Sequence, residues 1–261
     1  MTDHDAVVLT AEAGAIARIT LNRPQAGNSL SMDLVTALRQ ALTDLAPREA
    51  IKVIVISGMG GRIFSAGHDL NEFHGDPDPA FLEADFAGIT TLMQQVMAQP
   101  QIVIAKVEGV ATAAGCELVA ACDLALASTA ARFGVPGVNI GFWCHTPQVP
   151  LSRTVGRKQA MMMLATGKLF PADHALQIGL VNSLHEPEKL DEAVDALATT
   201  IASKSASVLR RGKQSFRNQS ALPLPEAYAL ARAEALENIV HPDAREGIAA
   251  FLEKREARWI V

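Results

Sequence analysis

Two short stretches of small residues, each following an apolar run, have the residue types of a catalytic site. The first is Phe64–Leu70, with the sequence FSAGHDL, and the second is Ala113–Glu117, with the sequence AAGCE. Where a strand turns into a helix, a backbone N–H lacks an intrachain partner and can donate to an outside oxygen. Two such donors form an oxyanion hole. Because Glu117 follows Ala114 by about one helical turn, its carboxylate could move a proton beside the polarised carbonyl, so the pattern predicts enolate chemistry.

Glu117 is a carboxylate inside an otherwise apolar stretch, between Cys116 and Leu118. Burying a carboxylate is costly unless it is paired. The residue is therefore either a structural hydrogen-bonding group or an acid/base group whose pKa is shifted by its surroundings. We interpret it as the acid/base group.

The elements that would position these residues alternate between short β-branched runs and helical patterns. Leu34, Leu38, Leu42 and Leu45 lie on one face of a helix that Ser31 could cap. The other expected elements are strands over residues 15–21, 53–56, 102–107 and 124–127, and helices over residues 86–97 and 115–121. Repeated β-β-α units with buried apolar strands favour an α/β core over an all-helical bundle.

The strand signal disappears after about residue 155, and only helices are predicted beyond that point. They cover residues 157–165, 171–178, 190–203, 207–218, 225–237 and 242–259. The pattern of this helical tail, taken by itself, indicates packing alone. No repeat or Pro/Gly/Ser-rich linker separates it from the core, so we expect the two to be continuous.

The composition limits the class of protein. Of 261 residues, 49% are hydrophobic and 20% are charged, which is ordinary for a folded globular chain. The formal net charge is −5 and 5% of residues are aromatic, so we expect no nucleic acid partner. The longest apolar region, residues 102–127, is interrupted by charged side chains, so we expect no membrane span.

Cysteine and histidine usage points to a reduced compartment without a metal. Cys116, Cys122 and Cys144 form no C-x-x-C pair and leave an odd one over, so we expect neither a disulfide framework nor a structural zinc site. The seven histidines are scattered without metal-ligand spacing. Residues 1–5 lack the basic and then apolar order of a signal peptide, and residues 259–261 are not a peroxisomal address. Together these features favour a cytoplasmic protein.

The order and spacing of the motifs resemble the crotonase family, the enoyl-CoA hydratase/isomerase superfamily, nearly from end to end. The matching motifs are Ile19–Pro24 with Asn28 and Leu30, Phe64–Leu70, Ile104–Gly109, Gly115–Ala120 with Cys122–Leu124, Phe133–Gly134 with Pro136 and Gly141, Leu164–Gly167, Gly179–Asn182, and Gly247 with Phe251–Arg255. The resemblance implies a crotonase (ClpP-like) spiral of ββα units. It further implies an acyl-CoA-binding core over residues 1–200 and a helical oligomerisation segment over 201–261, which assembles trimers or dimers of trimers.

By the same resemblance, the backbone N–H groups of His68 and Ala114 surround the oxygen of an acyl-CoA thioester, and Glu117 is a catalytic acid/base. Asp123 corresponds to a structural residue at a strand entry. The family's usual glycines are replaced by Ala113 and Ala114, which we expect to adopt conformations that a Cβ permits. The alternative is that the two stretches are ordinary glycine-containing turns.

Binding of coenzyme A, which is part of the substrate and not a separate cofactor, is also implied by the resemblance. The corresponding residues are Gln25, Ala26, Arg62, Ala66, His68, Asp69, Leu70, Phe251 and Lys254. The last two would come from a neighbouring subunit. For Arg62 and Lys254 the alternative is simple surface charge, because exposed cations are common.

One departure from the family pattern concerns the second catalytic glutamate of its hydratases, which follows the proline of an F-x-x-P-E motif. Here Phe133 and Pro136 are followed by Gly137. Losing one proton-transfer group costs about 10²- to 10⁴-fold, so we expect reduced or altered hydratase chemistry. The alternative function is a non-catalytic acyl-CoA binder. His145 is a candidate replacement acid/base unless it is a loop histidine that faces solvent or a neighbour. Gly137→Glu is expected to raise hydration of crotonyl-CoA if the rest of the site is intact.

Overall fold

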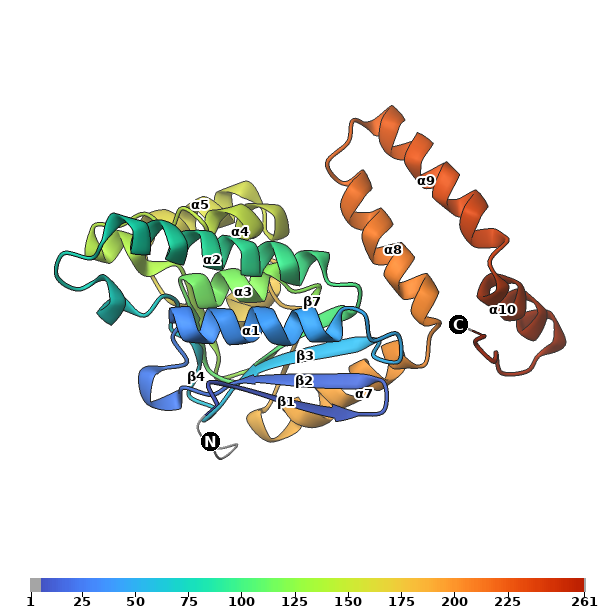
Figure 1. Ribbon diagram of the computed structural model, residues 1–261, viewed down its shortest axis with the longest axis horizontal. Coiled ribbons are helices and arrows are strands. Elements are labelled where there is room, and N and C mark those ends of the chain that lie inside the picture. The colour runs from blue at the N-terminus through green and yellow to red at the C-terminus, as the bar shows by residue number, and fades with distance from the viewer. Residues whose placement is uncertain (1–5, 261) are drawn as a thin grey trace.

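A computed structural model describes residues 6–260, so the expectations for residues 1–5 and for Val261 fall outside the described residues. The described chain forms two β-sheets with helices packed around them (Figure 1). The six-stranded sheet has the order β1-β2-β3-β5-β7-β10 and the four-stranded sheet has the order β4-β6-β8-β9. The strands of the larger sheet are β1 Val8–Ala13, β2 Ile16–Leu21, β3 Val53–Gly58, β5 Ile102–Val107, β7 Leu124–Ser128 and β10 Ser183–His185. Those of the smaller sheet are β4 Ile63–Ser65, β6 Val110–Thr112, β8 Arg132–Gly134 and β9 Phe170–Pro171.

The central strands of the larger sheet are parallel and apolar on both faces, because helices cover both sides of the sheet. In β3, Ile54 and Ile56 face the main hydrophobic core, whereas Val53 and Val55 face a second cluster with α7 (Leu190–Ala202). Helix α1 (Met32–Leu45) begins as predicted, since the Leu34 N–H donates to Ser31 Oγ at 3.4 Å. The four predicted leucines of α1 are all buried.

Eight further helices occur in residues 6–260. They are α2 Pro79–Ala98, α3 Ala114–Ala121, α4 Gln148–Thr154, α5 Arg157–Thr166, α6 Ala172–Gln177, α8 Ala206–Gln219, α9 Leu224–Ile239 and α10 Pro242–Glu253. Short 3₁₀ helices cover Pro24–Ala26, Leu70–Phe73, Pro136–Ile140 and Pro187–Lys189. Helix α2 begins well before the predicted residue 86, because Asp78 caps it and Pro79 is its first residue. None of the helices in residues 6–260 is long and apolar enough to cross a membrane.

Two expectations for the second half of the chain are wrong. Strands do occur after residue 155, since β9 pairs with β8 and β10 extends the larger sheet beside β7. Both strands are only two or three residues long, which is too short for a periodic sequence signal. The last helix ends at Glu253 instead of residue 259, because Lys254 takes a left-handed φ of 56° and caps it. The chain then turns back, and Trp259 Nε1 donates to the Ser203 carbonyl at 2.7 Å.

The smaller sheet brings the predicted catalytic stretches together. Strands β4, β6 and β8 are parallel neighbours, so the loops that follow them leave the same edge of the sheet. The loop after β4 carries His68, the turn after β6 leads into α3 at Ala114, and the turn after β8 carries Gly137. The carboxyl edge of a parallel sheet is where ligands commonly bind.

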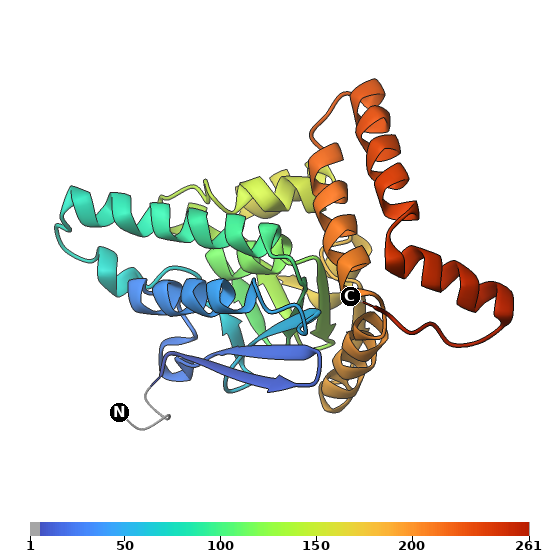
Figure 2. The ribbon, with the colours of Figure 1, turned by 45° about the vertical axis from the view of Figure 1, so that its right-hand side comes forward.

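Helices α8, α9 and α10 form an arm that extends away from the sheets (Figures 1 and 2). The predicted boundary at residue 200 falls in the last turn of α7, which packs on the larger sheet. The base of the arm is held by Lys213 of α8, whose Nζ is 2.5 Å from Asp123 Oδ2 and donates to the Gln101 carbonyl at 2.9 Å. Asp123 also accepts from the Val103 N–H at 2.7 Å, which agrees with the structural role predicted for it.

Candidate active site

The two stretches that would supply oxyanion donors are in contact. Thr112 Oγ1 donates to the Ala66 carbonyl at 3.0 Å, which joins the end of β6 to the loop after β4. Gly67 has a φ of 92°, and a Cβ placed on it would lie 2.7 Å from the Ala113 Cβ and 3.1 Å from the Ala114 nitrogen. Only a glycine allows this approach of the two segments.

The backbone N–H groups of His68 and Ala114 have no acceptor among residues 6–260, whereas those of the residues directly before them do. The Gly67 N–H donates to Ser65 Oγ at 3.3 Å, and the Ala113 N–H donates to the Gly134 carbonyl at 2.9 Å. Ala114 is the first residue of α3, where a free N–H and the positive end of the helix dipole coincide. Both groups can therefore donate to an oxygen supplied from outside the chain.

Ala113 contradicts the expectation that both alanines adopt conformations a Cβ permits. Its φ of 49° and ψ of −123° place it in a region that favours glycine. The conformation is held from both sides, because the Ala113 N–H donates to Gly134 and its carbonyl accepts from the Glu117 N–H at 3.0 Å. Such strain costs on the order of 1–3 kcal/mol and is common at functional sites.

Glu117 projects from α3 with 3% of its surface exposed. Burial raises the pKa of its carboxyl to about 7, although a hydrogen bond from Thr146 Oγ1 to Oε2 at 3.0 Å opposes the rise. A carboxyl with this pKa can both take and return a proton near neutral pH. Thr146 was not predicted as a site residue, because its only local signal is its place beside His145.

His145 is exposed, and its ring packs edge-on against Phe142 with the ring centres 5.8 Å apart. Within the described chain its side chain makes no hydrogen bond or ion pair. The side chain from this loop that contacts Glu117 is Thr146 and not His145. A role of His145 as an acid/base stays a prediction.

Gly137 lies in a closed turn that has no room for a side chain. The Phe142 N–H donates to the Gly137 carbonyl at 3.0 Å, and Gly141 follows with a φ of 74°. A Cβ on Gly137 would lie 2.4 Å from the Phe142 carbonyl oxygen and 2.8 Å from Cys144 Sγ. Because there is no space for a side chain, a glutamate at this position would not leave the rest of the site intact.

Gly137→Glu is therefore expected to destabilise the protein by about 1–3 kcal/mol or more and to give no gain in crotonyl-CoA hydration. The backbone oxygen of Phe142 cannot move aside as the end of a side chain could. Thermal unfolding and a hydration assay of the same preparation measure both effects. Gly212→Glu is the matched control, because nothing lies within 4 Å of a Cβ there. Faster hydration with an unchanged unfolding temperature would contradict the prediction.

Seven of the nine residues predicted to bind coenzyme A lie at positions 25–26 and on either side of β4, in segments that contact each other. The Ala66 N–H donates to the Gly27 carbonyl at 2.9 Å, and the Leu30 N–H donates to the Gly67 carbonyl at 2.7 Å. The side chains of this group that are exposed or partly exposed are Gln25, Ala26, Arg62, Ala66, His68 and Leu70. Ala66, His68 and Leu70 can meet a ligand that approaches the carboxyl edge of the smaller sheet, whereas Arg62 precedes β4 and lies at the amino end of that strand.

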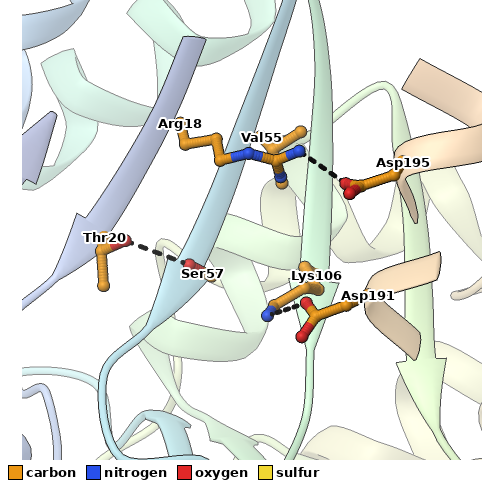
Figure 3. A pocket seen from close by; sticks show the side chains of 7 residues that line it. All are labelled: Arg18, Thr20, Val55, Ser57, Lys106, Asp191 and Asp195. Carbon is orange, nitrogen blue, oxygen red and sulfur yellow. Dashed lines mark hydrogen bonds and ion pairs between the residues drawn. The ribbon is translucent and has the colours of Figure 1, made fainter. Parts of the chain in front are cut away.

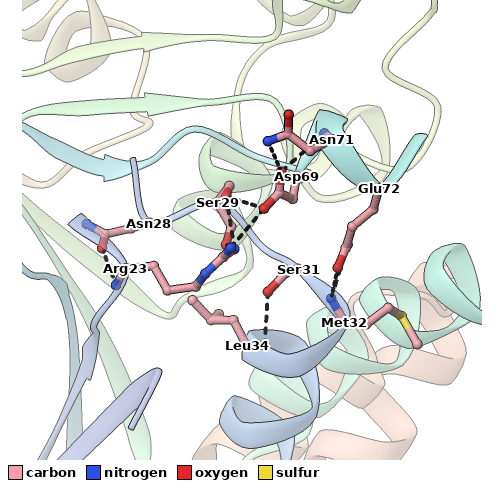
Figure 4. Close-up of polar contacts among 9 residues, drawn as sticks. All are labelled: Arg23, Asn28, Ser29, Ser31, Met32, Leu34, Asp69, Asn71 and Glu72. Carbon is pink, nitrogen blue, oxygen red and sulfur yellow. Dashed lines mark hydrogen bonds and ion pairs between the residues drawn. The ribbon is translucent and has the colours of Figure 1, made fainter. Parts of the chain in front are cut away.

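Asp69 is different, because its carboxylate is committed to other residues of the chain (Figure 4). Its Oδ2 lies 3.0 Å from Arg23 Nη2 and accepts from Ser29 Oγ at 3.2 Å, while Oδ1 accepts from the Asn71 amide at 2.9 Å. Burial would raise the pKa of Asp69, but the hydrogen bonds from Asn71, Arg23 and Ser29 together hold it below its usual value. Any contact between Asp69 and coenzyme A must therefore come from the main chain. The carboxylate instead fixes the loop that carries His68.

Phe251 and Lys254 lie on the arm, away from the sheets that carry the other site residues (Figure 1). The Phe251 side chain is 83% exposed. Within one chain these two residues are not part of the site, so their contribution from a neighbouring subunit stays a prediction.

A pocket of about 390 Å³ lies between α7 and the face of the larger sheet that is turned away from the main hydrophobic core (Figure 3). Arg18 pairs with Asp195 at 2.5 Å, and Lys106 pairs with Asp191 at 2.5 Å and with Glu108 at 2.6 Å. Both cations of this pocket are already neutralised, so it is not the candidate site. In the described part of the chain, no group of three His, Cys, Asp or Glu residues is arranged to hold a metal ion.

A family model described as enoyl-CoA hydratase/isomerase matches residues 11–260. The chain belongs to this family, and the predicted crotonase fold is confirmed by the solved structures that it resembles. It is 42% identical to mitochondrial enoyl-CoA hydratase domain-containing protein 3 of Danio rerio, over 98% of this chain and 89% of that protein. It is also 32% identical to a crotonyl-CoA hydratase of Syntrophomonas wolfei, over 94% of each.

Two solved structures match closely over almost the whole chain. An enoyl-CoA hydratase from Mycobacterium smegmatis superposes with a TM-score of 0.95 at 42% identity, covering 98% of this chain and 99% of that one. Human enoyl-CoA hydratase domain-containing protein 3 superposes with a TM-score of 0.94 at 38% identity, covering 97% and 100%.

Proposed function

We propose that this protein catalyses a reaction of an acyl-CoA thioester through an enolate. The N–H groups of His68 and Ala114 hold the thioester oxygen, and Glu117 transfers the proton. The observation that carries the proposal is the Glu117 carboxyl, buried one helical turn after a free N–H at the start of α3 and with a pKa raised to about 7. Membership of the enoyl-CoA hydratase/isomerase family supports it.

The proton transfer follows from these positions. An ionised Glu117 takes a proton from the carbon next to the thioester carbonyl, and the electron pair of that C–H bond moves onto the carbonyl oxygen. The two N–H groups stabilise the charge that develops there, and each such donor contributes on the order of 10²- to 10³-fold to the rate. The neutral Glu117 then returns the proton to carbon, either at the same position or further along the conjugated chain.

This arrangement favours reactions that need one proton-transfer group. Double-bond isomerisation uses the same carboxyl for removal and return of the proton, whereas hydration also needs a group that activates water. Because Gly137 occupies the position of the second glutamate expected from the family pattern, we infer slow or altered hydration. The alternative, a protein that binds acyl-CoA without turnover, makes a different prediction in the experiment below.

The test is incubation of the pure protein with saturated, 2-enoyl and 3-enoyl-CoA esters in D₂O, followed by mass spectrometry. We expect deuterium to enter the carbon next to the thioester and 3-enoyl esters to convert to 2-enoyl esters faster than the latter are hydrated. Exchange without net reaction would still support the enolate. Bound acyl-CoA with no exchange and no turnover would favour the non-catalytic alternative.

We also propose that the protein is a homo-oligomer, a trimer or a dimer of trimers. The arm exposes large apolar side chains, which isolated soluble chains rarely gather in one region. They include Phe216, Leu224, Tyr228, Leu236, Phe251 and Leu252, each at least 65% exposed. A cytoplasmic location is proposed from the three free cysteines.

A further inference from the structure

A buried acid and imidazole lie beside the proposed oxyanion hole. Asp85 of α2 is 1% exposed, and its Oδ2 is 3.4 Å from Nε2 of His68, whose side chain is 13% exposed. The geometry of this contact is not that of a hydrogen bond. Among residues 6–260, neither His68 Nε2 nor either Asp85 carboxyl oxygen has a hydrogen-bond partner. Three polar atoms at one place without partners are unusual, because buried polar groups are normally paired.

Aromatic rings surround this pair. The centre of the His68 ring is 5.5 Å from that of Phe73 and 5.3 Å from that of Phe86. Phe86 in turn lies 6.0 Å from Phe142, whose loop also carries Thr146, the partner of Glu117. A wall of rings therefore runs from the loop after β4 across α2 to the loop that contacts Glu117. The His68 imidazole and the Asp85 carboxyl are the polar groups next to these rings.

Among the residues that the structure describes, no cation neutralises the Asp85 carboxylate. Burial, and to a lesser extent the nearby charge of Glu72, raises the pKa of Asp85 to about 6, while burial lowers the pKa of His68 to about 4. At neutral pH the imidazole is therefore uncharged. A ligand group that donates a hydrogen bond is what the carboxylate lacks, and a hydroxyl can also bond with an imidazole nitrogen.

His68 links this pair to the substrate. Its backbone N–H is one of the two donors proposed to hold the thioester oxygen, and its ring belongs to the same residue. The acyl chain is bonded to the carbonyl carbon that carries this oxygen. It therefore passes within a side chain's length of the His68 ring. A plain hydrocarbon in contact with the ring and with Asp85 would leave their polar atoms unpaired, which is costly.

We propose that His68 and Asp85 form a recognition point for a polar acyl chain, so that the protein prefers acyl-CoA esters carrying a hydroxyl beyond the third carbon of the chain over hydrocarbon esters of equal length. The hydroxyl donates to the Asp85 carboxylate and pairs with His68 Nε2. This inference rests on the proposed function, because it takes the thioester to be held by the N–H groups of His68 and Ala114.

The experiment measures dissociation constants by calorimetry for straight-chain saturated acyl-CoA esters of several lengths and for the matching esters that carry a hydroxyl beyond the third carbon. We expect at least one hydroxyacyl ester to bind about tenfold or more tightly than its hydrocarbon counterpart. In Asp85→Leu that preference is expected to vanish or reverse. Glu83→Gln, which changes an exposed carboxylate on the same helix, is the matched control and keeps the preference.

The outcomes separate the inference from the proposed function. Equal affinities for every pair, or a preference that persists in Asp85→Leu, would overturn the recognition point while the proposed function stands. No binding of any acyl-CoA ester would overturn both. If Asp85→Leu does not fold, Asp85→Asn provides the second test, because the neutral amide keeps the shape and is a weaker acceptor. A preference undiminished in Asp85→Asn would then overturn the inference.

Discussion

Glu117→Gln is expected to lower kcat/KM by about 10²- to 10⁴-fold and to leave acyl-CoA binding nearly unchanged. The amide keeps the shape of the side chain and still accepts the hydrogen bond from Thr146, but it cannot take a proton. Deuterium exchange next to the thioester should fall with the rate, because both pass through the same proton transfer. Glu83→Gln, an exposed change of the same chemistry on α2, is expected to retain full activity.

The same substitution is expected to stabilise the protein at high pH. Burial raises the pKa of Glu117 from 4.5 to about 7, so the folded state binds this proton more tightly than the unfolded state does. The stabilising effect of the proton is fully present below about pH 4.5 and is lost as pH rises towards 7, leaving a cost of about 3 kcal/mol above that. Glutamine does not ionise and escapes this cost.

Urea unfolding of wild type and Glu117→Gln at about pH 5 and about pH 8 measures the effect, since a difference between the two proteins cancels all other titrating groups. The advantage of the variant in free energy of unfolding should grow with pH. An advantage that is equal at both pH values would show that Glu117 is not held neutral by burial. A turnover rate unaffected by the substitution would remove Glu117 as the proton-transfer group.

Gly67→Ala is expected to lower kcat by about 10²- to 10³-fold, as for the loss of an oxyanion donor. The new methyl group would lie 2.7 Å from the Ala113 Cβ and 3.0 Å from the Thr112 carbonyl oxygen, and the φ of 92° disfavours any Cβ. Relief of the clash must separate the loop carrying His68 from the start of α3. The two N–H groups then no longer reach one oxygen.

Ala113→Gly tests this explanation. Alone it relieves the positive φ of Ala113, so it is expected to leave activity intact and to raise the unfolding temperature by a few degrees. Combined with Gly67→Ala it removes one of the two clashing Cβ atoms and should recover part of the lost rate. A double variant no faster than Gly67→Ala would mean that the contact between positions 67 and 113 does not control the spacing of the donors.

Local patterns in the sequence were enough for the parts of the site that depend on neighbouring residues. The leucines of α1, the turn around Gly67 and the helix that carries Glu117 each have a signal within one segment. Thr146 and Asp85 had none, because they meet Glu117 and His68 only when segments 29 and 17 residues apart fold together.

Three further features could not be predicted from the sequence, for the same reason. The strand β10 is three residues long and is recognisable only by its place beside β7. The strain at Ala113 results from hydrogen bonds to Gly134 and Glu117, which no propensity of alanine could indicate. The family pattern around Gly137 predicted that the second carboxylate is absent. The closed turn that leaves no room for a side chain there depends on the positions of Phe142 and Cys144, which the sequence does not give.

The ion pair at the base of the arm has a consequence for assembly. Lys213 is 7% exposed, and its partner Asp123 follows directly after the helix that carries Glu117. Swinging α8 to a new angle would separate Lys213 from Asp123, whose side chain is 25% exposed, and would remove the charge that compensates the buried ammonium group. In the proposed oligomer, in which copies of the chain would meet through their arms, the angle of the arm is therefore tied to the residue that follows the helix carrying Glu117.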